Sequence, residues 1–497
     1  MKPIFTIKHL ALGCLMPTTI TAQITLPQQP NIVIIVADDL GYGDLSCYGA
    51  TALQTPGMDR IANEGLRFTS AYCTAATSTP SRYSLLTGKY PWTNNEAKIL
   101  PGNAAMIIDT EQITLPKIMK KAGYVTGTVG KWHLGLGDGT VDWNEKVTPG
   151  ANEIGYDYSF IQAATNDRVP CIFIENGYGV GLDKNDPLYV SYRTNFEGEP
   201  TGKNNPELLR MHPSIGHDGS IVNGIPRIGF QKGGKKAQWK DENMAEIFLE
   251  KAKEFVQKNQ NKPFFLYYGL HQPHVPRVPN ERFVGKSGMG PRGDVILEAD
   301  WCVSEFLKEL DQLGLTDNTL VILTSDNGPQ LDDGYQDYAV ELIGNHKPSG
   351  PHRGGKCSLY NGGTCIPFLL RWPAVVEKGV SNSLVCQMDL LASLAALTGQ
   401  TYSDQIDSQN TLPVFLGKSN KGREELIIEG MLDYAFRQGN YVMIPPYPNF
   451  NNSFQLFDIK EDIEQKHNLA EKYPSLLRKM MIRFEHLKRT TGKITDY

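Results

Sequence analysis

The chain has 497 residues, a formal net charge of -5 and 40% hydrophobic residues. This composition is typical of a folded globular protein and excludes a disordered one. The negative net charge argues against nucleic acid as a partner, because binding to a phosphate backbone requires a basic surface. At roughly 100 to 200 residues per domain, the length predicts one large domain and a smaller one.

Residues 1–22 have the pattern of a signal peptide. Two early lysines precede a short apolar run from Leu10 to Met16, and small and polar residues follow. The run is too short to cross a bilayer, and no later stretch approaches the roughly 20 apolar residues of a transmembrane helix. We therefore expect export to the periplasm without stable membrane insertion. Lipid attachment at Cys14 is the alternative.

Several apolar runs have the character of buried parallel strands and end in polar residues. These runs cover residues 31–36, 124–129, 264–268 and 320–324. The polar residues that follow them are Asp38 and Asp39, Lys131 and His133, His271, and Asp326 and Asn327. Because ligands bind beyond the carboxyl ends of the strands in open α/β sheets, we expect these side chains to converge.

Helix signals lie between these strands, in the form of Thr-Pro starts and glycine stops or of long amphipathic periods. The predicted helices run from Thr55 to Gly65, from Thr114 to Gly123, from about 241 to 258 and from about 296 to 313. Alternating strands and helices predict an α/β fold, in which helices sandwich a large mixed or parallel sheet.

Two regions depart from this alternation. Residues 150–236 are rich in Gly, Pro and Asn and show no sustained period, so we expect elaborated loops there. From residue 401 the chain becomes polar, and short strands at 426–428, 441–444 and 453–457 precede a predicted helix over 474–489. We therefore expect residues 23–400 to form the large α/β domain and 401–497 a smaller α+β subdomain.

The most specific local pattern is Ser78-Thr79-Pro80-Ser81-Arg82, followed by Thr87-Gly88. Pro80 and Ser81 suit a turn into a helix, whose N-terminal N–H groups favour an anion at residue 78. Further segments contain Gly130-Lys131-Trp132-His133-Leu134-Gly135, His271-Gln272-Pro273-His274, and Gly355-Lys356 with Tyr360-Asn361-Gly362-Gly363.

Together these segments resemble the type I sulfatases, formylglycine-dependent enzymes with an alkaline-phosphatase-like fold, here with the serine-type signature of bacterial carbohydrate sulfatases. The resemblance implies that a maturation enzyme oxidises Ser78 to formylglycine. If Ser78 is an engineered replacement, the precursor is a native cysteine. It also implies one Ca²⁺ ion, with Mg²⁺ as the other candidate, held by Asp38, Asp39, Ser78, Asp326 and Asn327. An all-oxygen ligand set suits such a hard cation, whereas zinc calls for His or Cys.

The resemblance also implies the catalytic roles. One hydroxyl of the formylglycine hydrate attacks sulfur, and the other remains available to expel sulfate. Arg82 and the metal hold the hydrate, and Lys131 and Lys356 stabilise charge on the sulfuryl oxygens. His271 protonates the departing sugar oxygen and His133 acts as the base. Asn361 stands where the family usually has glutamate, which puts the local hydrogen bonding in doubt.

The expected partner is a sulfated saccharide, with galactose or N-acetylgalactosamine units preferred. Candidate contacts to the sugar are Arg168, His217, His274, His352 and Arg353. Two alternatives remain open. A phosphoester hydrolase of the same superfamily would commonly have an Asp-His pair at the position of Asp326-Asn327, and a catalytically silent protein would bind sulfated glycans without oxidising Ser78.

Overall fold

The computed structural model describes residues 29–431, 433–448 and 450–491. The expected signal peptide and Cys14 lie outside the described residues. Within the described ranges, no helix combines the length and the apolar composition needed to cross a bilayer.

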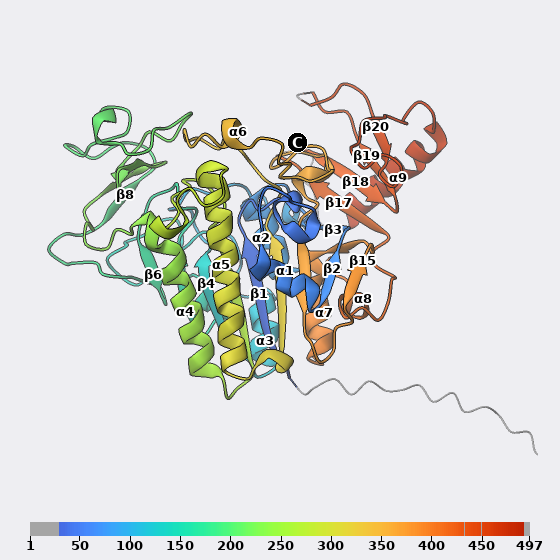
Figure 1. Cartoon of the computed structure of the whole chain (residues 1–497), viewed down its shortest axis with the longest axis horizontal. Coiled ribbons are helices and arrows are strands. Elements are labelled where there is room, and N and C mark those ends of the chain that lie inside the picture. Colours follow the sequence, from blue (N-terminus) through green and yellow to red (C-terminus); the bar gives the residue numbers. More distant parts are fainter. Residues whose placement is uncertain (1–28, 432, 449, 492–497) are drawn as a thin grey trace, which may run out of the picture.

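A ten-stranded sheet forms the centre of the molecule (Figure 1). Its strands are β1 (Asn31–Ala37), β2 (Leu66–Phe68), β4 (Val125–Lys131), β5 (Tyr158–Gln162), β6 (Phe173–Glu175), β7 (Tyr178–Gly179), β12 (Phe264–Gly269), β13 (Thr319–Ser325), β14 (Phe368–Arg371) and β15 (Gly379–Ser381). They lie in the order β15-β2-β14-β13-β1-β12-β4-β5-β6-β7. The run from β13 to β5 is parallel, whereas β14 and β6 are antiparallel to their inner neighbours. The predicted mixed sheet is therefore confirmed.

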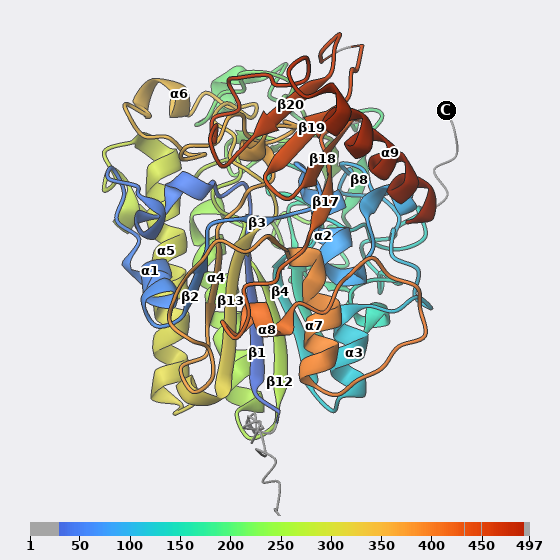
Figure 2. The same ribbon diagram turned by 90° about the vertical axis from the view of Figure 1, so that its right-hand side faces the viewer.

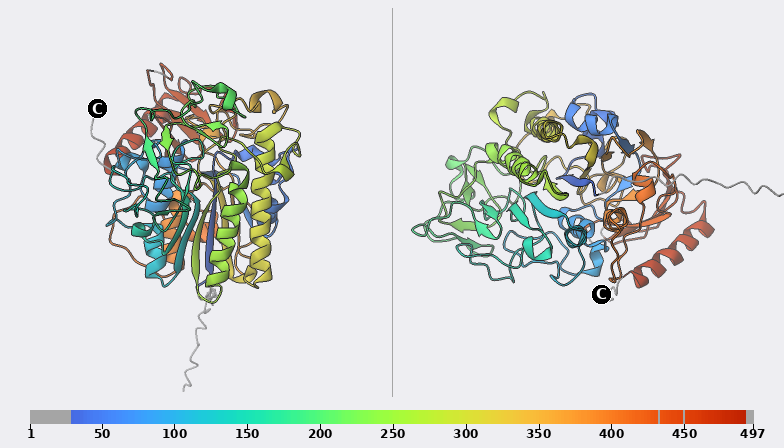
Figure 3. Two further views of the ribbon diagram at one scale, coloured as in Figure 1. Left: turned by 90° about the vertical axis from the view of Figure 1, so that its left-hand side faces the viewer. Right: turned by 90° about the horizontal axis from the view of Figure 1, so that it is seen from below.

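Helices cover both faces of this sheet (Figures 2 and 3). One face carries α1 (Pro56–Asn63), α4 (Met244–Asn259) and α5 (Gly290–Gln312), and the other carries α2 (Ser78–Thr87), α3 (Leu115–Lys121), α7 (Leu390–Leu397) and α8 (Leu412–Phe415). Alternate side chains of β1 enter the two layers: Ile34 packs into one core and Ile35 into the other. Because successive side chains of a strand point to opposite faces, a strand buried on both faces has a continuous apolar sequence.

The region 150–236 contains more regular structure than the sequence predicted. Besides β5, β6 and β7, it forms the short strands β8 (Tyr189–Ser191), β9 (Ile221–Val222), β10 (Ile225–Pro226) and β11 (Phe230–Lys232). These pair as two small antiparallel ribbons, β8 with β11 and β9 with β10. Strands this short give no detectable period in the sequence. Pairing between distant segments stabilises β8 and β11, whereas β9 and β10 form a local hairpin through Asn223 and Gly224.

The C-terminal subdomain is a four-stranded antiparallel sheet with one long helix. It consists of β17 (Glu425–Glu429), β18 (Tyr434–Gln438), β19 (Tyr441–Ile444), β20 (Gln455–Asp458) and α9 (Pro474–Thr490). Val414, Phe415 and Leu416 instead pack into the core of the large sheet. This segment, which follows the expected boundary at residue 400, therefore packs with the larger unit.

The remaining elements are short. β3 (Ala71–Tyr72) pairs with β16 (Val385–Cys386), and α6 (Ala339–Leu342) lies in the long loop after β13. A bridge between Ala75 and Glu429 joins the C-terminal sheet to the segment that leads into α2. The start of α2 is therefore supported by the smaller subdomain.

Asp44 anchors the loop that follows β1. Its carboxylate accepts hydrogen bonds from Arg292 on α5 at 2.6 and 2.9 Å and from the backbone N–H of Gly41 at 2.8 Å. His346 Nε2 lies 2.8 Å from the same carboxylate. Asp44 and Arg292 are both almost fully buried, so this ion pair fixes the loop against α5 in a dry environment.

We expect Arg292→Met to lower the free energy of unfolding by about 3–5 kcal/mol, because it leaves the buried Asp44 carboxylate without its cation. Chemical denaturation followed by intrinsic fluorescence measures the change. The matched control is Arg60→Met, which breaks a partly exposed pair with Asp311 and is expected to cost about 1 kcal/mol or less. Equal losses in the two variants would contradict the role given to the Asp44 anchor.

Candidate active site

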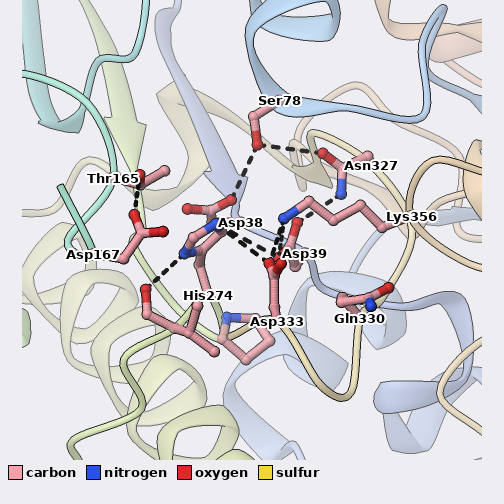
Figure 4. Close-up of polar contacts among 12 residues, drawn as sticks. Asp38, Asp39, Ser78, Thr165, Asp167, His274, Asn327, Gln330, Asp333 and Lys356 are labelled. Carbon is pink, nitrogen blue, oxygen red and sulfur yellow. Dashed lines mark hydrogen bonds and ion pairs between the residues drawn. The ribbon is translucent and has the colours of Figure 1, made fainter. Parts of the chain in front are cut away.

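Side chains distant in the sequence meet at the carboxyl ends of the central strands (Figure 4). Asp38 and Asp39 follow β1, Lys131 ends β4, and Asp326 and Asn327 follow β13. Because β4, β12, β1 and β13 are consecutive parallel neighbours, their ends lie along one edge of the sheet. The convergence expected from the sequence is therefore present for these five residues.

Lys131 links the serine at the start of α2 to the end of β1. Its Nζ lies 2.6 Å from Asp38 Oδ1 and 2.9 Å from Ser78 Oγ. Ser78 is 4% exposed, and its hydroxyl also lies 3.3 Å from Asn327 Oδ1. The ammonium group thus donates to the residue 78 oxygen and to the neighbouring carboxylate. Burial lowers the pKa of Lys131, and the carboxylates of Asp38 and Asp326 oppose that effect.

Arg82, one turn further along α2, holds Asp326. Its Nε donates to Asp326 Oδ2 at 3.0 Å, and Nη1 donates to the Tyr267 hydroxyl at 3.0 Å. Although burial alone would raise the pKa of Asp326, the charges of Arg82 and Lys131 hold it below its ordinary value. Burial dominates at Asp38 and raises its pKa, despite the attraction of Lys131.

A second lysine contacts a different carboxylate of the cluster. Lys356 Nζ donates to Asp39 Oδ2 at 2.9 Å and to Asp333 Oδ2 at 2.7 Å. Asp39 in turn accepts a hydrogen bond from Asn327 Nδ2 at 2.7 Å. Asp39 has a positive φ of 63°, a conformation that non-glycine residues rarely adopt. Strained backbone of this kind is concentrated at functional sites.

This donor set fits a hard divalent cation. Asp38, Asp39, Asp326 and Asn327 supply carboxylate and amide oxygens, which Ca²⁺ and Mg²⁺ prefer. Asp38 Oδ2 is buried and has no hydrogen-bond partner among the described residues, so it has an unused lone pair inside the cluster. A ligand atom of His274 also lies within 4.8 Å of those of Asp38 and Asp39.

Of the two histidines after β12, the structure places His274 at the site and His271 behind it. His274 Nε2 lies 3.9 Å from Asp39 Oδ2 and 3.8 Å from Asp333 Oδ2, and its Nδ1 lies 2.7 Å from the Val275 carbonyl oxygen. His271 packs against the ring of Phe248. The structure therefore brings His274, and not His271, to the lining of the cavity that contains Ser78.

His133 has one ring nitrogen fixed and one free. Nε2 lies 3.0 Å from the Leu100 carbonyl oxygen and must donate to it, whereas Nδ1 is buried without a partner among the described residues. His133 has a φ of 57°, and Gly130, three residues earlier, has a φ of 103°. A Cβ at Gly130 would lie 1.9 Å from the Gly269 carbonyl oxygen, so only glycine allows β4 and β12 to approach so closely here.

A cavity of about 230 Å³ opens onto this cluster. Predicted site residues that line it are Ser78, His133, Arg168, His217, His274 and Lys356. Asp39, Asp326 and Asn327 lie beneath it and are almost fully buried. The cavity therefore gives a ligand access to Ser78 from one side, with the two lysines and the carboxylates around that residue.

Asp167, Arg168 and His217 form a polar group on the wall of this cavity. Arg168 Nη1 donates to Asp167 Oδ1 at 2.8 Å, and His217 Nε2 lies 3.0 Å from Asp167 Oδ2. His217 Nδ1 lies 2.8 Å from the Ile215 carbonyl oxygen, so both ring nitrogens face acceptors. Burial alone would lower the pKa of His217, but its hydrogen bond to Asp167 raises it above the ordinary value.

Two other candidate sugar contacts lie outside the 230 Å³ cavity. His352 and Arg353 line a larger, adjoining cavity of about 710 Å³. The Arg353 guanidinium stacks on the Tyr360 ring at 3.8 Å, and His352 packs edge-on against Tyr42. Asn361 is buried, and its side-chain oxygen and nitrogen have no partner among the described residues, so no local replacement for the family's glutamate contact is present there.

The sequence reasoning missed several residues of the cavity wall. Asp333 pairs with Lys356 and lies near His274, and Ile99 and Ile228 supply apolar surface. Asp333 follows another aspartate in a loop without periodicity, and both isoleucines lie in irregular segments that contain proline. No local signal distinguishes them from ordinary surface residues, because their importance arises only from the folded loops.

Comparison of the sequence with known proteins identifies sulfatases as its relatives. A family model described as Sulfatase matches residues 30–400. The chain is 50% identical over 477 residues to an N-acetylgalactosamine-6-O-sulfatase of Bacteroides thetaiotaomicron, covering 93% of each chain. It is 31% identical to human arylsulfatase A over 439 residues, which is 85% of this chain and 76% of that protein.

Comparison with solved structures finds proteins of the same fold. One from work on the metabolism of multiple glycosaminoglycans by Bacteroides thetaiotaomicron superimposes with a TM-score of 0.92 at 49% identity, covering 93% of this chain and all of the other. A phosphonate monoester hydrolase of Agrobacterium radiobacter has a TM-score of 0.58 at 16% identity, over 93% of this chain and 96% of the other, which supports the common fold alone.

The donor set predicts that the metal-free protein binds one Ca²⁺ ion, and that Asp39→Asn weakens this binding at least about tenfold, since a hard cation loses a charged oxygen ligand. Isothermal titration calorimetry measures both affinities. His274→Ala is the informative comparison. If the ligands are all oxygens, this variant keeps its Ca²⁺ affinity within about twofold. Binding of Zn²⁺ by the wild-type protein that disappears in His274→Ala would contradict the hard-cation site.

Proposed function

The chain belongs to the sulfatase family and is a sulfuric ester hydrolase; we propose that it removes the 6-sulfate of N-acetylgalactosamine units in a sulfated glycan. The 50% identity to the N-acetylgalactosamine-6-O-sulfatase supports this substrate. The observation that carries the chemistry is the contact of Lys131 with both Ser78 and Asp38 at the base of the 230 Å³ cavity.

Two groups complete the site in this proposal. The hydrate of formylglycine at residue 78 would supply two hydroxyls, one to attack sulfur and one for releasing sulfate, and a Ca²⁺ or Mg²⁺ ion held by Asp38, Asp39, Asp326 and Asn327 would supply positive charge beside it. Arg82 supports this arrangement by orienting Asp326 from the same helix that carries residue 78. The chain's own residues then bind the sulfate ester and move its protons.

Lys131 and Lys356 are placed to stabilise charge on the sulfate. They contact different carboxylates of the cluster, and Lys356 also lines the cavity. Both side chains are at least nine-tenths buried, so their charges act in a medium with little water to screen them. Charges fixed in advance around a reacting group favour its transition state, because little reorganisation is needed when the bond breaks.

We assign the two proton transfers to His274 and His133. His274 Nε2 faces the cavity next to Asp333, so it is positioned to protonate the departing sugar oxygen. His133 carries its proton on Nε2 toward Leu100, which leaves the Nδ1 lone pair to accept a proton from the oxygen of residue 78. His271, previously expected as the proton donor, is given no direct role.

Asp167, Arg168 and His217 form the proposed contact to the sugar ring. Their mutual hydrogen bonds fix the side chains in place, and all three line the cavity beyond Ser78. Charged groups held in this way donate to and accept from sugar hydroxyls without losing side-chain entropy on binding. They therefore favour a hexose with defined hydroxyl orientation over a flexible or aromatic sulfate ester.

The two alternative functions receive less support. Phosphoester hydrolases are similar in fold only, and Asn327 replaces the histidine that a second zinc commonly requires. A silent glycan-binding protein would not need Lys131, His133, His274 and Lys356 arranged around Ser78. We further propose export to the periplasm and a separate maturation enzyme that oxidises Ser78.

Protein made in its native host is expected to contain formylglycine at residue 78 and to release sulfate from N-acetylgalactosamine 6-sulfate. Peptide mass spectrometry and ion chromatography of sulfate measure the two properties. N-acetylglucosamine 6-sulfate is the matched substrate, differing only at C4, and we expect at least about tenfold lower kcat/KM for it, from the loss of one hydrogen bond to a charged group.

Ser78→Ala is the control variant, since it keeps the fold but cannot be oxidised. Unmodified serine in protein that still releases sulfate would contradict the formylglycine chemistry. Modified protein that hydrolyses only phosphate esters would contradict the proposed function itself.

His274→Ala is expected to lower kcat by roughly 10²–10⁴-fold, the usual contribution of a positioned proton donor. His271→Ala, at the matched position three residues earlier, is expected to lower kcat less than about tenfold. The reverse ranking in steady-state assays would restore His271 as the proton donor. A nitrophenol leaving group needs little protonation. With such a substrate the loss of kcat in His274→Ala should therefore be smaller, whereas the loss caused by removing a merely structural residue should not change.

A further inference from the structure

The position of His274 depends on how the loop of residues 270–280 is held. Three prolines in this loop have no backbone N–H group, so the loop can donate few backbone hydrogen bonds. Side chains therefore have to fix it in place. One of them is Arg277, which is almost fully buried and forms an ion pair of 2.8 Å with Asp337 in the loop after β13.

Glu298 on α5 fastens the same loop at two further points. Its Oε2 accepts a hydrogen bond from Gln272 Nε2 at 3.2 Å, and its Oε1 accepts one from the backbone N–H of Asn280 at 2.9 Å. Gln272 precedes His274 in the chain and Asn280 follows it. A single side chain on a 23-residue helix therefore fixes the loop both before and after this histidine.

Gln272 also connects Glu298 to the carboxylate cluster. The carbonyl oxygen of Gln272 accepts a hydrogen bond of 3.0 Å from the backbone N–H of Asp38. His274 lies two residues further along, with its Nε2 3.8 Å from Asp333 Oδ2. A displacement of Gln272 would therefore move His274 relative to the carboxylates and to the cavity that contains Ser78.

Glu298 has no cation to compensate its burial. It is 2% exposed and forms no ion pair within the described residues, since the neighbouring Arg282 pairs with Glu246. Burial raises the pKa of Glu298 to about 7. An unpaired buried carboxyl group contributes poorly to the stability of a fold, and groups of this kind are concentrated at functional sites.

Gln272 can pair with Glu298 in either protonation state. Its Nε2 donates to the carboxylate, whereas its Oε1 is buried without a partner among the described residues. When Glu298 takes up a proton, rotation of the amide lets Oε1 accept a hydrogen bond from the carboxyl O–H. The link between α5 and the loop thus depends on hydrogen-bonding groups and not on a charge.

We propose that Glu298 is a positioning residue for sulfate ester hydrolysis, and that it acts through Gln272 and Asn280 to hold His274 beside the departing sugar oxygen. The inference rests on the proposed function, which assigns the protonation of that oxygen to His274. Glu298 itself lines neither the 230 Å³ cavity nor the 710 Å³ cavity, so it acts on the substrate only through the loop.

The test uses two substitutions of Glu298 in protein that carries formylglycine. Glu298→Met removes both acceptors but keeps an unbranched side chain, and we expect kcat for N-acetylgalactosamine 6-sulfate to fall roughly 10–100-fold, because the proton donor is displaced. KM is expected to change much less than kcat. Glu298→Gln still accepts from Asn280 and pairs with Gln272 Oε1, so its kcat is expected to stay within about threefold of wild type.

Glu309→Met is the matched control. Glu309 is a second buried glutamate of α5, and it accepts a hydrogen bond of 2.8 Å from Gln257 Nε2 on α4, outside the loop of residues 270–280. This variant loses the same type of Glu–Gln hydrogen bond from the same helix, and we expect its kcat to fall less than about twofold.

Two further measurements separate positioning of the proton donor from general loosening of the fold. With a nitrophenyl sulfate, whose leaving group needs little protonation, the loss in Glu298→Met is expected to shrink to less than about threefold. Gln272→Met breaks the link without changing α5, so it serves if Glu298→Met does not fold. When both fold, the double variant is expected to lose no more than about twofold beyond Glu298→Met, because the two changes remove the same contact.

Equal losses of kcat in Glu298→Met and Glu309→Met would overturn the inference. So would a Glu298→Gln variant as impaired as Glu298→Met, or an undiminished loss with the nitrophenyl substrate. Failure of the wild-type protein to release sulfate would instead count against the proposed function. Hydrogen exchange of peptides covering residues 270–280 then decides the inference: about tenfold faster exchange in Glu298→Met than in Glu309→Met supports it, and equal exchange overturns it.

Discussion

Buried opposite charges hold this structure together at its centre. Asp38, Asp39 and Asp326 lie almost fully buried, and desolvating three carboxylates is tolerable only because cations lie within hydrogen-bonding distance. Lys131 comes from β4 and Arg82 from α2, so the charge balance also links separate elements. Removing one partner would leave an unpaired charge in a dry interior, and the site is therefore as much a constraint on folding as on chemistry.

The parallel sheet explains how such distant residues meet. In each βα unit the chain returns to the same edge of the sheet. Asp38 and Asp326 therefore become neighbours, and so do Asp39 and Asn327, which are 288 positions apart in the sequence. The surrounding loops then determine which ligand can enter. The C-terminal subdomain supports the segment before Ser78 and supplies Glu464 and Lys466 to the adjoining 710 Å³ cavity.

The sequence predicted the elements with continuous apolar runs, such as β1 and β13, because burial on both faces leaves a pattern that needs no neighbour to interpret. It did not predict β5 or β18, which have only five residues each and become strands by pairing with the strands before and after them. The cluster of carboxylate and amide groups that suits a metal ion could also be predicted, because these residues directly follow the same apolar strands. His271 was preferred to His274 because the order of residues in a loop does not reveal which ring turns toward the site, and Asp333 reaches Lys356 only after the loop has folded.

The burial of Ser78 limits when the proposed oxidation of this residue can occur. The residue is 4% exposed at the bottom of a cavity of about 230 Å³, which admits a sugar but not the active site of another protein. An enzyme that carries out the proposed oxidation of Ser78 would therefore have to act before the chain folds. Under the proposed function, molecules that fold first would keep an unmodified serine, and the yield of active protein would depend on the relative rates of oxidation and folding.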